Sequence, residues 1–140
     1  MTSEQAGRAI VYARSQGRCE LCGRAADTFH HRVKRSQGGT WDPANGLHVC
    51  GDGTRYCHGW IEAHPAHAMA LGLWLPRGTN PAAWPAWLRP TMWWRGWWYA
   101  DNDGCWTWDA SRSLHPTPPE EVTAAYRALV IDRAISLTEV

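Results

Sequence analysis

Two neighbouring histidines are the first residues in this chain whose types and placement could do chemistry. His30 and His31 stand in the stretch FHHRVKRSQGG, where three basic residues and a glycine pair follow them. Neighbouring side chains of an extended strand point to opposite faces, so we expect the two imidazoles to serve different purposes. One can hold a divalent metal ion, and the other can take a proton from water. Metal-assisted hydrolysis of a phosphodiester uses both.

Four of the five cysteines form two pairs that are typical of a metal site. Cys19 and Cys22 lie in CELC, and Cys50 and Cys57 lie in CGDGTRYC. Structural zinc takes four thiolates from two turn-like pairs far apart in the sequence, which favours a structural Zn²⁺ that clips the first turn to the start of a helix. Buried free cysteines, a redox Cys-x-x-Cys pair and a Cys3His site that uses His58 are the alternatives.

Capping residues, turn formers and apolar periodicity predict a compact α+β chain. Ser3 is expected to cap the first helix, and Pro65 to open a short helix that Gly72 ends. A loop dense in turn formers joins two short strands. The expected elements are helices over about 4–15, from near His58 and over 65–72, with strands over 28–33 and 47–50.

The second half of the chain differs in composition. Prolines break up residues 76–90, which we expect to form an irregular connector. The stretch WWRGWWYADNDGCWTWD predicts a β-hairpin with its turn at 102–104. A final helix has three start signals, which are Thr117 as N-cap, Pro118 at the first position and Glu120 completing a capping box.

Charge and hydropathy exclude some protein classes. The 140 residues carry a net charge of +1, whereas the first 60 hold eight basic and five acidic residues, an excess of three positive charges. No apolar run is long enough for a signal peptide or a membrane span. We therefore expect a cytoplasmic protein without membrane contact, in which cysteines bind metals more often than they form disulfides.

The histidine and cysteine motifs together resemble the HNH endonuclease family. The resemblance covers residues 19–72 and rests on CELC, HHR, GG, ANGLHVCG and CHGWIEAHP, in the family's order. It extends to small phage-encoded HNH proteins with a four-cysteine zinc site. It implies a small zinc-stabilised ββα-metal core within residues 1–75, which also hold the N-terminal helix. Residues 76–140 would form a subdomain of Trp-rich hairpin and C-terminal helix that could dock a partner.

The resemblance also implies a role for each matching residue. His31 would be the general base that activates water, and Asn45 would hold the loop between the strands through backbone hydrogen bonds. His30 and His58 would bind a catalytic divalent ion (Mg²⁺, Mn²⁺, Ni²⁺ or Zn²⁺), with Glu62 as a candidate third ligand. The alternatives are a buried His30 satisfied by a backbone carbonyl and a solvated Glu62.

Basic residues directly after the histidine pair suggest contacts to DNA. Arg32, Lys34 and Arg35 could hold phosphates without reading bases, although a solvated basic loop has the same composition. His48 alternates with apolar neighbours on the second strand, and we expect it to face solvent or DNA.

Tryptophan accounts for 11 residues, concentrated in the second half of the chain. Three interpretations compete: a second aromatic core, a protein interface, and base stacking on single-stranded nucleic acid. We favour a core plus a partner interface, and the family resemblance implies terminase as that partner. Cys105, within the hairpin, is expected to be a packed thiol.

These features predict a metal-dependent HNH endonuclease that hydrolyses DNA phosphodiester bonds. The resemblance implies a phage-encoded protein that acts in DNA packaging or processing in the host cytoplasm. A non-catalytic zinc module that binds DNA or protein and an RNA-directed nuclease are the rival hypotheses.

Overall fold

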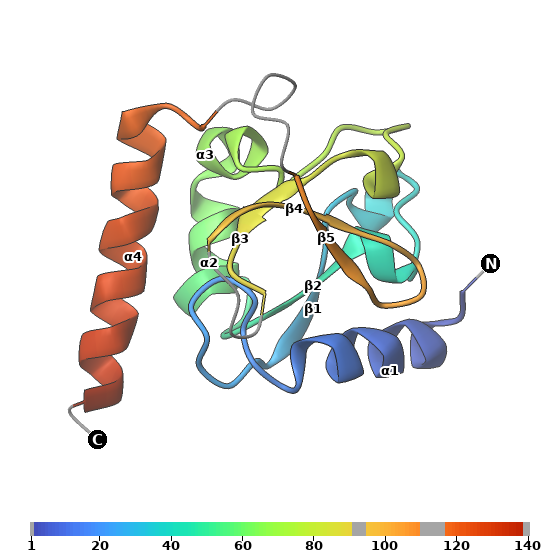
Figure 1. Ribbon diagram of the computed structural model, residues 1–140, viewed down its shortest axis with the longest axis horizontal. Coiled ribbons are helices and arrows are strands. Elements are labelled where there is room, and N and C mark those ends of the chain that lie inside the picture. Colours follow the sequence, from blue (N-terminus) through green and yellow to red (C-terminus); the bar gives the residue numbers. More distant parts are fainter. Residues whose placement is uncertain (1, 91–94, 110–116, 139–140) are drawn as a thin grey trace.

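The computed structural model of the chain is mixed α+β over the residues that it describes, 2–90, 95–109 and 117–138 (Figure 1). Helices and short strands alternate, and none of the described helices is long and apolar enough to cross a membrane. The elements are α1 (Glu4–Ser15), β1 (Thr28–His31), β2 (Gly46–Val49), α2 (Tyr56–Ala63), α3 (Pro65–Ala70), β3 (Ala86–Leu88), β4 (Gly96–Ala100), β5 (Trp106–Trp108) and α4 (Glu120–Thr138), with 3-10 helices at Arg35–Gln37, Pro43–Asn45 and Pro81–Ala83.

Strands β1 and β2 form an antiparallel pair that leads into α2. His30 lies opposite Leu47 and His31 opposite Gly46 in this pair. Gly46 lets the ring of Phe29 pack against the backbone of β2, because a Cβ atom at position 46 would collide with that ring and force it to move. The two histidines therefore sit at the end of a short two-stranded sheet whose register is fixed by local packing.

Helix α1 confirms the sequence prediction in its bounds and its cap. The Ser3 hydroxyl accepts a hydrogen bond from the Ala6 amide, and the helix ends where Gln16 adopts a left-handed conformation. Buried Arg14 on this helix pairs with buried Glu20 at 2.7 Å, and Glu20 also accepts from the His48 amide. This network, which sequence patterns did not indicate, ties α1 to the cysteine turn and to β2.

The second sheet has the strand order β3-β4-β5. The predicted hairpin is present as β4 and β5, while Trp93 and Trp94 at its expected start lie outside the described residues. Strand β3 corrects the expectation of an irregular connector, because Ala86 and Leu88 pair with β4 and are buried. A three-residue strand between prolines carries too short a pattern to be recognised from sequence.

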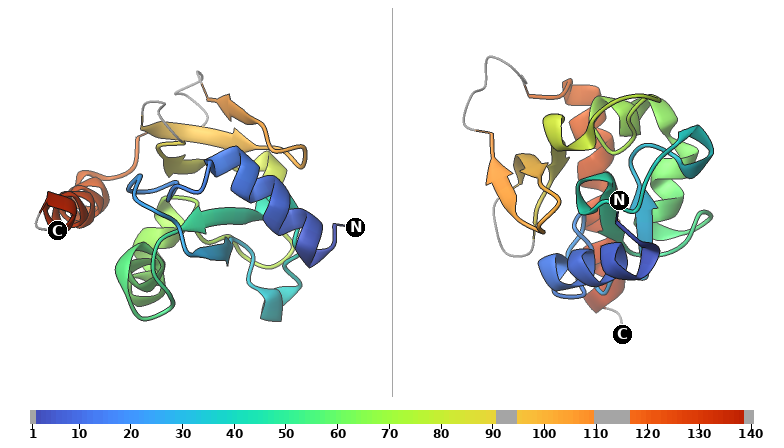
Figure 2. Two further views of the ribbon diagram at one scale, coloured as in Figure 1. Left: turned by 90° about the horizontal axis from the view of Figure 1, so that it is seen from below. Right: turned by 90° about the vertical axis from the view of Figure 1, so that its right-hand side faces the viewer.

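Helix α4 begins at Glu120, two residues later than expected. The Pro119 carbonyl accepts from the amides of Val122 and Thr123, so the helical hydrogen bonds start after the proline pair and Thr117 is not the N-cap. In Figures 1 and 2, α4 lies on the outer side of α2 and α3. It is anchored by buried Tyr126, whose hydroxyl donates to the Leu21 carbonyl at 3.0 Å.

One cluster of buried side chains draws on both sides of position 75. The two sheets, α2, α3 and α4 all contribute to it. Its members include Leu47, Val49, Ile61, Leu71, Leu73, Ala86, Leu88, Trp98, Val122 and Tyr126. Burial of this apolar surface is the main driving force that holds the second half against the first.

Arg32 is buried, which corrects its predicted role as a phosphate ligand. Its side chain is 1% exposed, and its guanidinium donates to five backbone carbonyls, those of Ala44, Gly72, Pro81, Trp84 and Pro85, at 2.8–3.2 Å. Burial lowers the pKa of Arg32 to about 9, so it stays a cation at neutral pH. Arg32 therefore joins three loops and cannot reach DNA.

We expect Arg32→Met to lower the free energy of unfolding by about 3 kcal/mol or more, because five backbone carbonyls, three of them in buried hydrogen bonds, lose their donor. The matched change at an exposed arginine, Arg35→Met, should stay within about 0.5 kcal/mol of the parent protein. Urea unfolding followed by tryptophan fluorescence measures both. An equal decrease in the free energy of unfolding for the two variants would contradict the anchoring role of Arg32.

Candidate functional site

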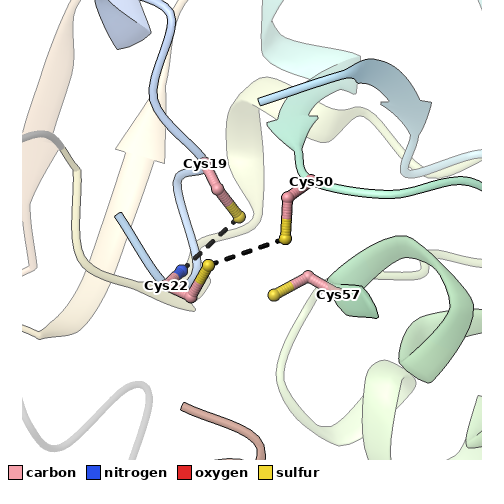
Figure 3. Close-up of side chains that lie close together, drawn as sticks. All are labelled: Cys19, Cys22, Cys50 and Cys57. Atoms are coloured by element: carbon pink, nitrogen blue, oxygen red, sulfur yellow. Dashed lines mark hydrogen bonds between the residues drawn. The ribbon is translucent and has the colours of Figure 1, made fainter. Parts of the chain in front are cut away.

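Four cysteines converge at one point between β2 and α2 (Figure 3). Cys19 and Cys22 come from the turn after α1, Cys50 follows β2, and Cys57 lies in the first turn of α2. Their sulfur atoms all lie within 4.8 Å of one another, and the Sγ atoms of Cys22 and Cys50 are 3.6 Å apart. The Cys22 amide donates to Cys19 Sγ at 3.5 Å, which folds the first pair into a tight turn.

This geometry and donor set fit a tetrahedral metal ion. Zinc–thiolate bonds of about 2.3 Å place neighbouring sulfurs about 3.8 Å apart, close to the Cys22–Cys50 distance. Burial raises the pKa of Cys19 well above its usual range, because a thiolate loses its hydration there, and a bound cation would offset that penalty. The four cysteines are thus placed to hold a metal ion such as zinc.

A second group of potential metal ligands comes from β1 and α2. His30, His58 and Glu62 each bring a ligand atom within 4.8 Å of the others. The rings of His30 and His58 are 5.4 Å apart between centroids, and Glu62 Oε1 lies 3.6 Å from His58 Nε2. His58 therefore belongs to this group, which removes the basis for a Cys3His site.

Hydrogen bonds orient both imidazoles of the second group. His30 Nε2 lies 2.7 Å from the Leu73 carbonyl, so Nε2 carries the proton and Nδ1 keeps a free lone pair. His58 Nδ1 lies 3.1 Å from Thr28 Oγ1, and this hydroxyl also lies near the carbonyls of Val49 and Gly51. When the hydroxyl donates to a carbonyl, it accepts from His58 Nδ1 and leaves Nε2 free. Such second contacts are typical of histidine ligands.

The cysteine group positions the second group. Cys57 directly precedes His58, and the His58 amide donates to the Cys50 carbonyl at 3.0 Å. Any ion that draws the thiols together therefore also fixes the first turn of α2. Because His58 and Glu62 are four residues apart, they lie on one face of this helix.

His31 points to a different environment from His30. It is half-buried, with its ring 4.4 Å from Trp41 and 4.9 Å from Phe29 between centroids. Burial, reinforced by Arg35, lowers the pKa of His31 to about 4, and burial lowers that of His30 to about 3. Both imidazoles are therefore neutral at pH 7.

The Nε2 atom of His31 is buried and has no hydrogen-bond partner among the described residues. Unpartnered buried polar atoms are rare. His31 lines a hollow of about 210 Å³ together with His30, His58 and Glu62. A neutral imidazole and three potential metal ligands thus line one small space.

Asn45 makes the backbone hydrogen bonds that were expected of it. Its fully buried side chain donates to the carbonyls of Val33 and Thr40 at 3.1 and 3.0 Å, and accepts from the Val33 amide at 2.8 Å. These bonds close the loop between β1 and β2 directly after the histidine pair.

The remaining predicted residues separate into two sets. Lys34 and Arg35 are exposed and line the same hollow, with Lys34 Nζ 4.0 Å from the ring of Trp74. His48, which was expected to face solvent or DNA, is half-buried, and its Nδ1 lies 2.7 Å from the Ser15 hydroxyl of α1. Cys105 is exposed instead of packed, because it lies in the hairpin turn.

Several residues of the site could not be found from the sequence. Thr28 orients His58, and the Leu73 carbonyl orients His30. Trp74 lines the hollow, and Trp41 packs against the ring of His31. Leu73 lies 43 residues from His30, so no local spacing could have connected them.

Comparison with family models, with curated proteins and with solved structures finds no match to this chain. What the chain does must therefore be inferred from the two groups themselves.

We expect purified protein to hold zinc in the four-cysteine site, and Cys57→Ser to lose that zinc together with the native near-ultraviolet circular dichroism. Folding and metal binding are coupled in such sites, with apparent binding energies of about 10–16 kcal/mol in small zinc modules. Cys105→Ser is the matched control, because Cys105 is exposed and outside the group. Metal analysis and spectra that are identical for the two variants would rule out the four-cysteine site.

Proposed function

We propose that the chain is a metal-dependent endonuclease of the HNH type, which hydrolyses DNA phosphodiester bonds with a histidine-activated water. The observation that supports it best is the shared hollow: three potential ligands of one ion and an unpartnered neutral imidazole face the same space. They come from β1 and α2, in the order that the family resemblance implies for a ββα-metal core.

The metal ligands would be His30, His58 and Glu62. His30 offers Nδ1, His58 offers Nε2, and Glu62 offers its carboxylate at the more exposed side. Two imidazoles and a carboxylate are a set that suits divalent transition metals and leaves positions open. A divalent ion held by these residues would stabilise negative charge on the scissile phosphate and on the departing 3′ oxygen.

His31 would act as the general base. His31 lines the hollow and its imidazole is neutral at pH 7, so it can accept a proton from a water bound there. The contacts with Phe29 and Trp41 limit rotation of the ring, and Asn45 holds the following loop through Val33. Water attack in line with the 3′ oxygen would leave a product with a 5′ phosphate.

Lys34 and Arg35 would hold the phosphates that flank the scissile bond. Both are exposed and both line the hollow, whereas Arg32 is buried and plays no such part. With few phosphate contacts, binding should be weak and should fall with rising salt concentration.

A non-catalytic zinc module is the strongest alternative. It accounts for the four cysteines, but it gives no purpose to His30, His58, Glu62 and the unpartnered His31 side by side. An RNA-directed nuclease would use the same residues, and cleavage of matched RNA and DNA strands separates the two.

We expect His31→Ala to lower the rate of divalent-dependent nicking of supercoiled plasmid by about 100-fold or more, the usual contribution of general base catalysis. His64→Ala is the matched control, because His64 is an exposed histidine that stacks on Trp60, outside the hollow. Both variants should keep the zinc content and the melting temperature of the parent protein.

Two outcomes would count against this proposal. Equal nicking by the parent and by His31→Ala would remove His31 as the base. Intact plasmid with folded, zinc-loaded parent protein that binds DNA would refute the nuclease.

A further inference from the structure

Three adjoining hollows lead from the candidate catalytic site across the surface. Trp74 lines all three, and Lys34 is shared by the first, of about 210 Å³, and the second, of about 280 Å³. Met69, Leu75 and Pro76 are shared by the second and the third, of about 520 Å³. We call these three adjoining hollows, which are linked by the five shared residues, the Trp74 groove.

The far end of the Trp74 groove is apolar and aromatic. Trp84 and Trp97 line the third hollow together with Trp74. Trp84 is 48% exposed, so about half of this residue's surface is open to solvent at this end of the groove. The segment before α4, over 117–119, lines the same hollow as Met69 and Ala70 of α3. A flat aromatic ligand could stack there.

The charges along the groove are almost all positive. Lys34, Arg35 and Arg77 line the first two hollows, and Glu62 is the only acidic side chain among the described residues that line the three. Lys34 Nζ lies 4.0 Å from the ring of Trp74, so positive charge and aromatic surface adjoin each other. Grooves that combine cations with exposed aromatic rings are typical of single-stranded nucleic acid sites.

We propose that the Trp74 groove binds unpaired nucleotides of the DNA strand next to the scissile phosphate. Bases would stack on Trp84, and phosphates would contact Lys34 and Arg77. The inference rests on the proposed nuclease function for its orientation, since one end of the groove is the candidate catalytic site. It makes DNA with a single-stranded segment the preferred substrate.

A proline-rich peptide is the other ligand that such a surface could attract, because these peptides dock in aromatic-lined grooves. The row of cations and the continuity with the histidine group favour nucleic acid instead. A peptide site would need neither feature.

Binding can be measured without turnover. Fluorescence anisotropy of a labelled phosphorothioate oligo(dT) of about 12 nucleotides, a length within the usual range of single-strand sites, is compared with that of the matched duplex. Zinc-loaded protein carrying His31→Ala serves as the parent. Trp84→Ala should weaken binding of the single strand about fivefold or more, the effect of losing one stacked base, and should leave duplex binding unchanged.

Two variants make the result specific. Trp108→Ala removes an indole of similar exposure, 45%, that lines none of the three hollows, and should have no effect on the dissociation constant. Trp84→Phe keeps an aromatic face and should restore most of the affinity. Arg77→Gln should reduce the slope of log affinity against log salt by about one.

Each outcome bears on the inference. It is overturned if Trp84→Ala leaves the affinity for the single strand unchanged, or if the duplex binds at least as tightly as the single strand. It is also overturned if Trp84→Ala weakens binding of a proline-rich peptide but not of the single strand. Trp84-dependent single-strand binding by a protein that never cuts DNA would support the groove and refute the nuclease. Nicking with no preference for unpaired DNA would do the reverse.

Discussion

Four thiols that meet in a buried space impose the constraint on which the rest of the site depends. Cys19, Cys50 and Cys57 are buried, and their sulfurs and that of Cys22 lie close together, an arrangement that needs a cation to be stable as thiolates. The turn after α1, the end of β2 and the first turn of α2 are thereby held at one point. His58 follows Cys57 directly, so the same constraint brings it beside His30.

A second constraint comes from buried polar side chains in the loops. Arg32 satisfies five carbonyls, and Asn45 closes the loop after β1. Between them, these residues hold irregular backbone in a fixed shape without regular secondary structure. Neighbouring residues of this segment therefore differ in solvent exposure: His30 and Arg32 are buried, His31 is half-buried, and Lys34 is exposed.

Local patterns predicted the elements that local chemistry determines. The Ser3 cap, the two cysteine pairs and the β4–β5 hairpin are all visible in short stretches, and the structure confirms α1, the convergence of the thiols and the hairpin. Features that depend on distant partners were missed or wrong. Strand β3 exists because β4 pairs with it, and burial of Arg32 and the His48–Ser15 bond depend on segments that no sequence spacing connects.

If the residues around His31 hydrolyse phosphodiester bonds with a bound divalent ion, the cut strand must carry the ends that hydrolysis leaves. Supercoiled plasmid is treated with zinc-loaded protein and Mg²⁺, Mn²⁺ or Ni²⁺, and the nicked product is then incubated with DNA ligase without prior phosphorylation. We expect divalent-dependent nicks that ligase seals, because hydrolysis leaves a 5′ phosphate and a 3′ hydroxyl. Plasmid that stays intact with every ion, or nicks that ligase cannot seal, would contradict it.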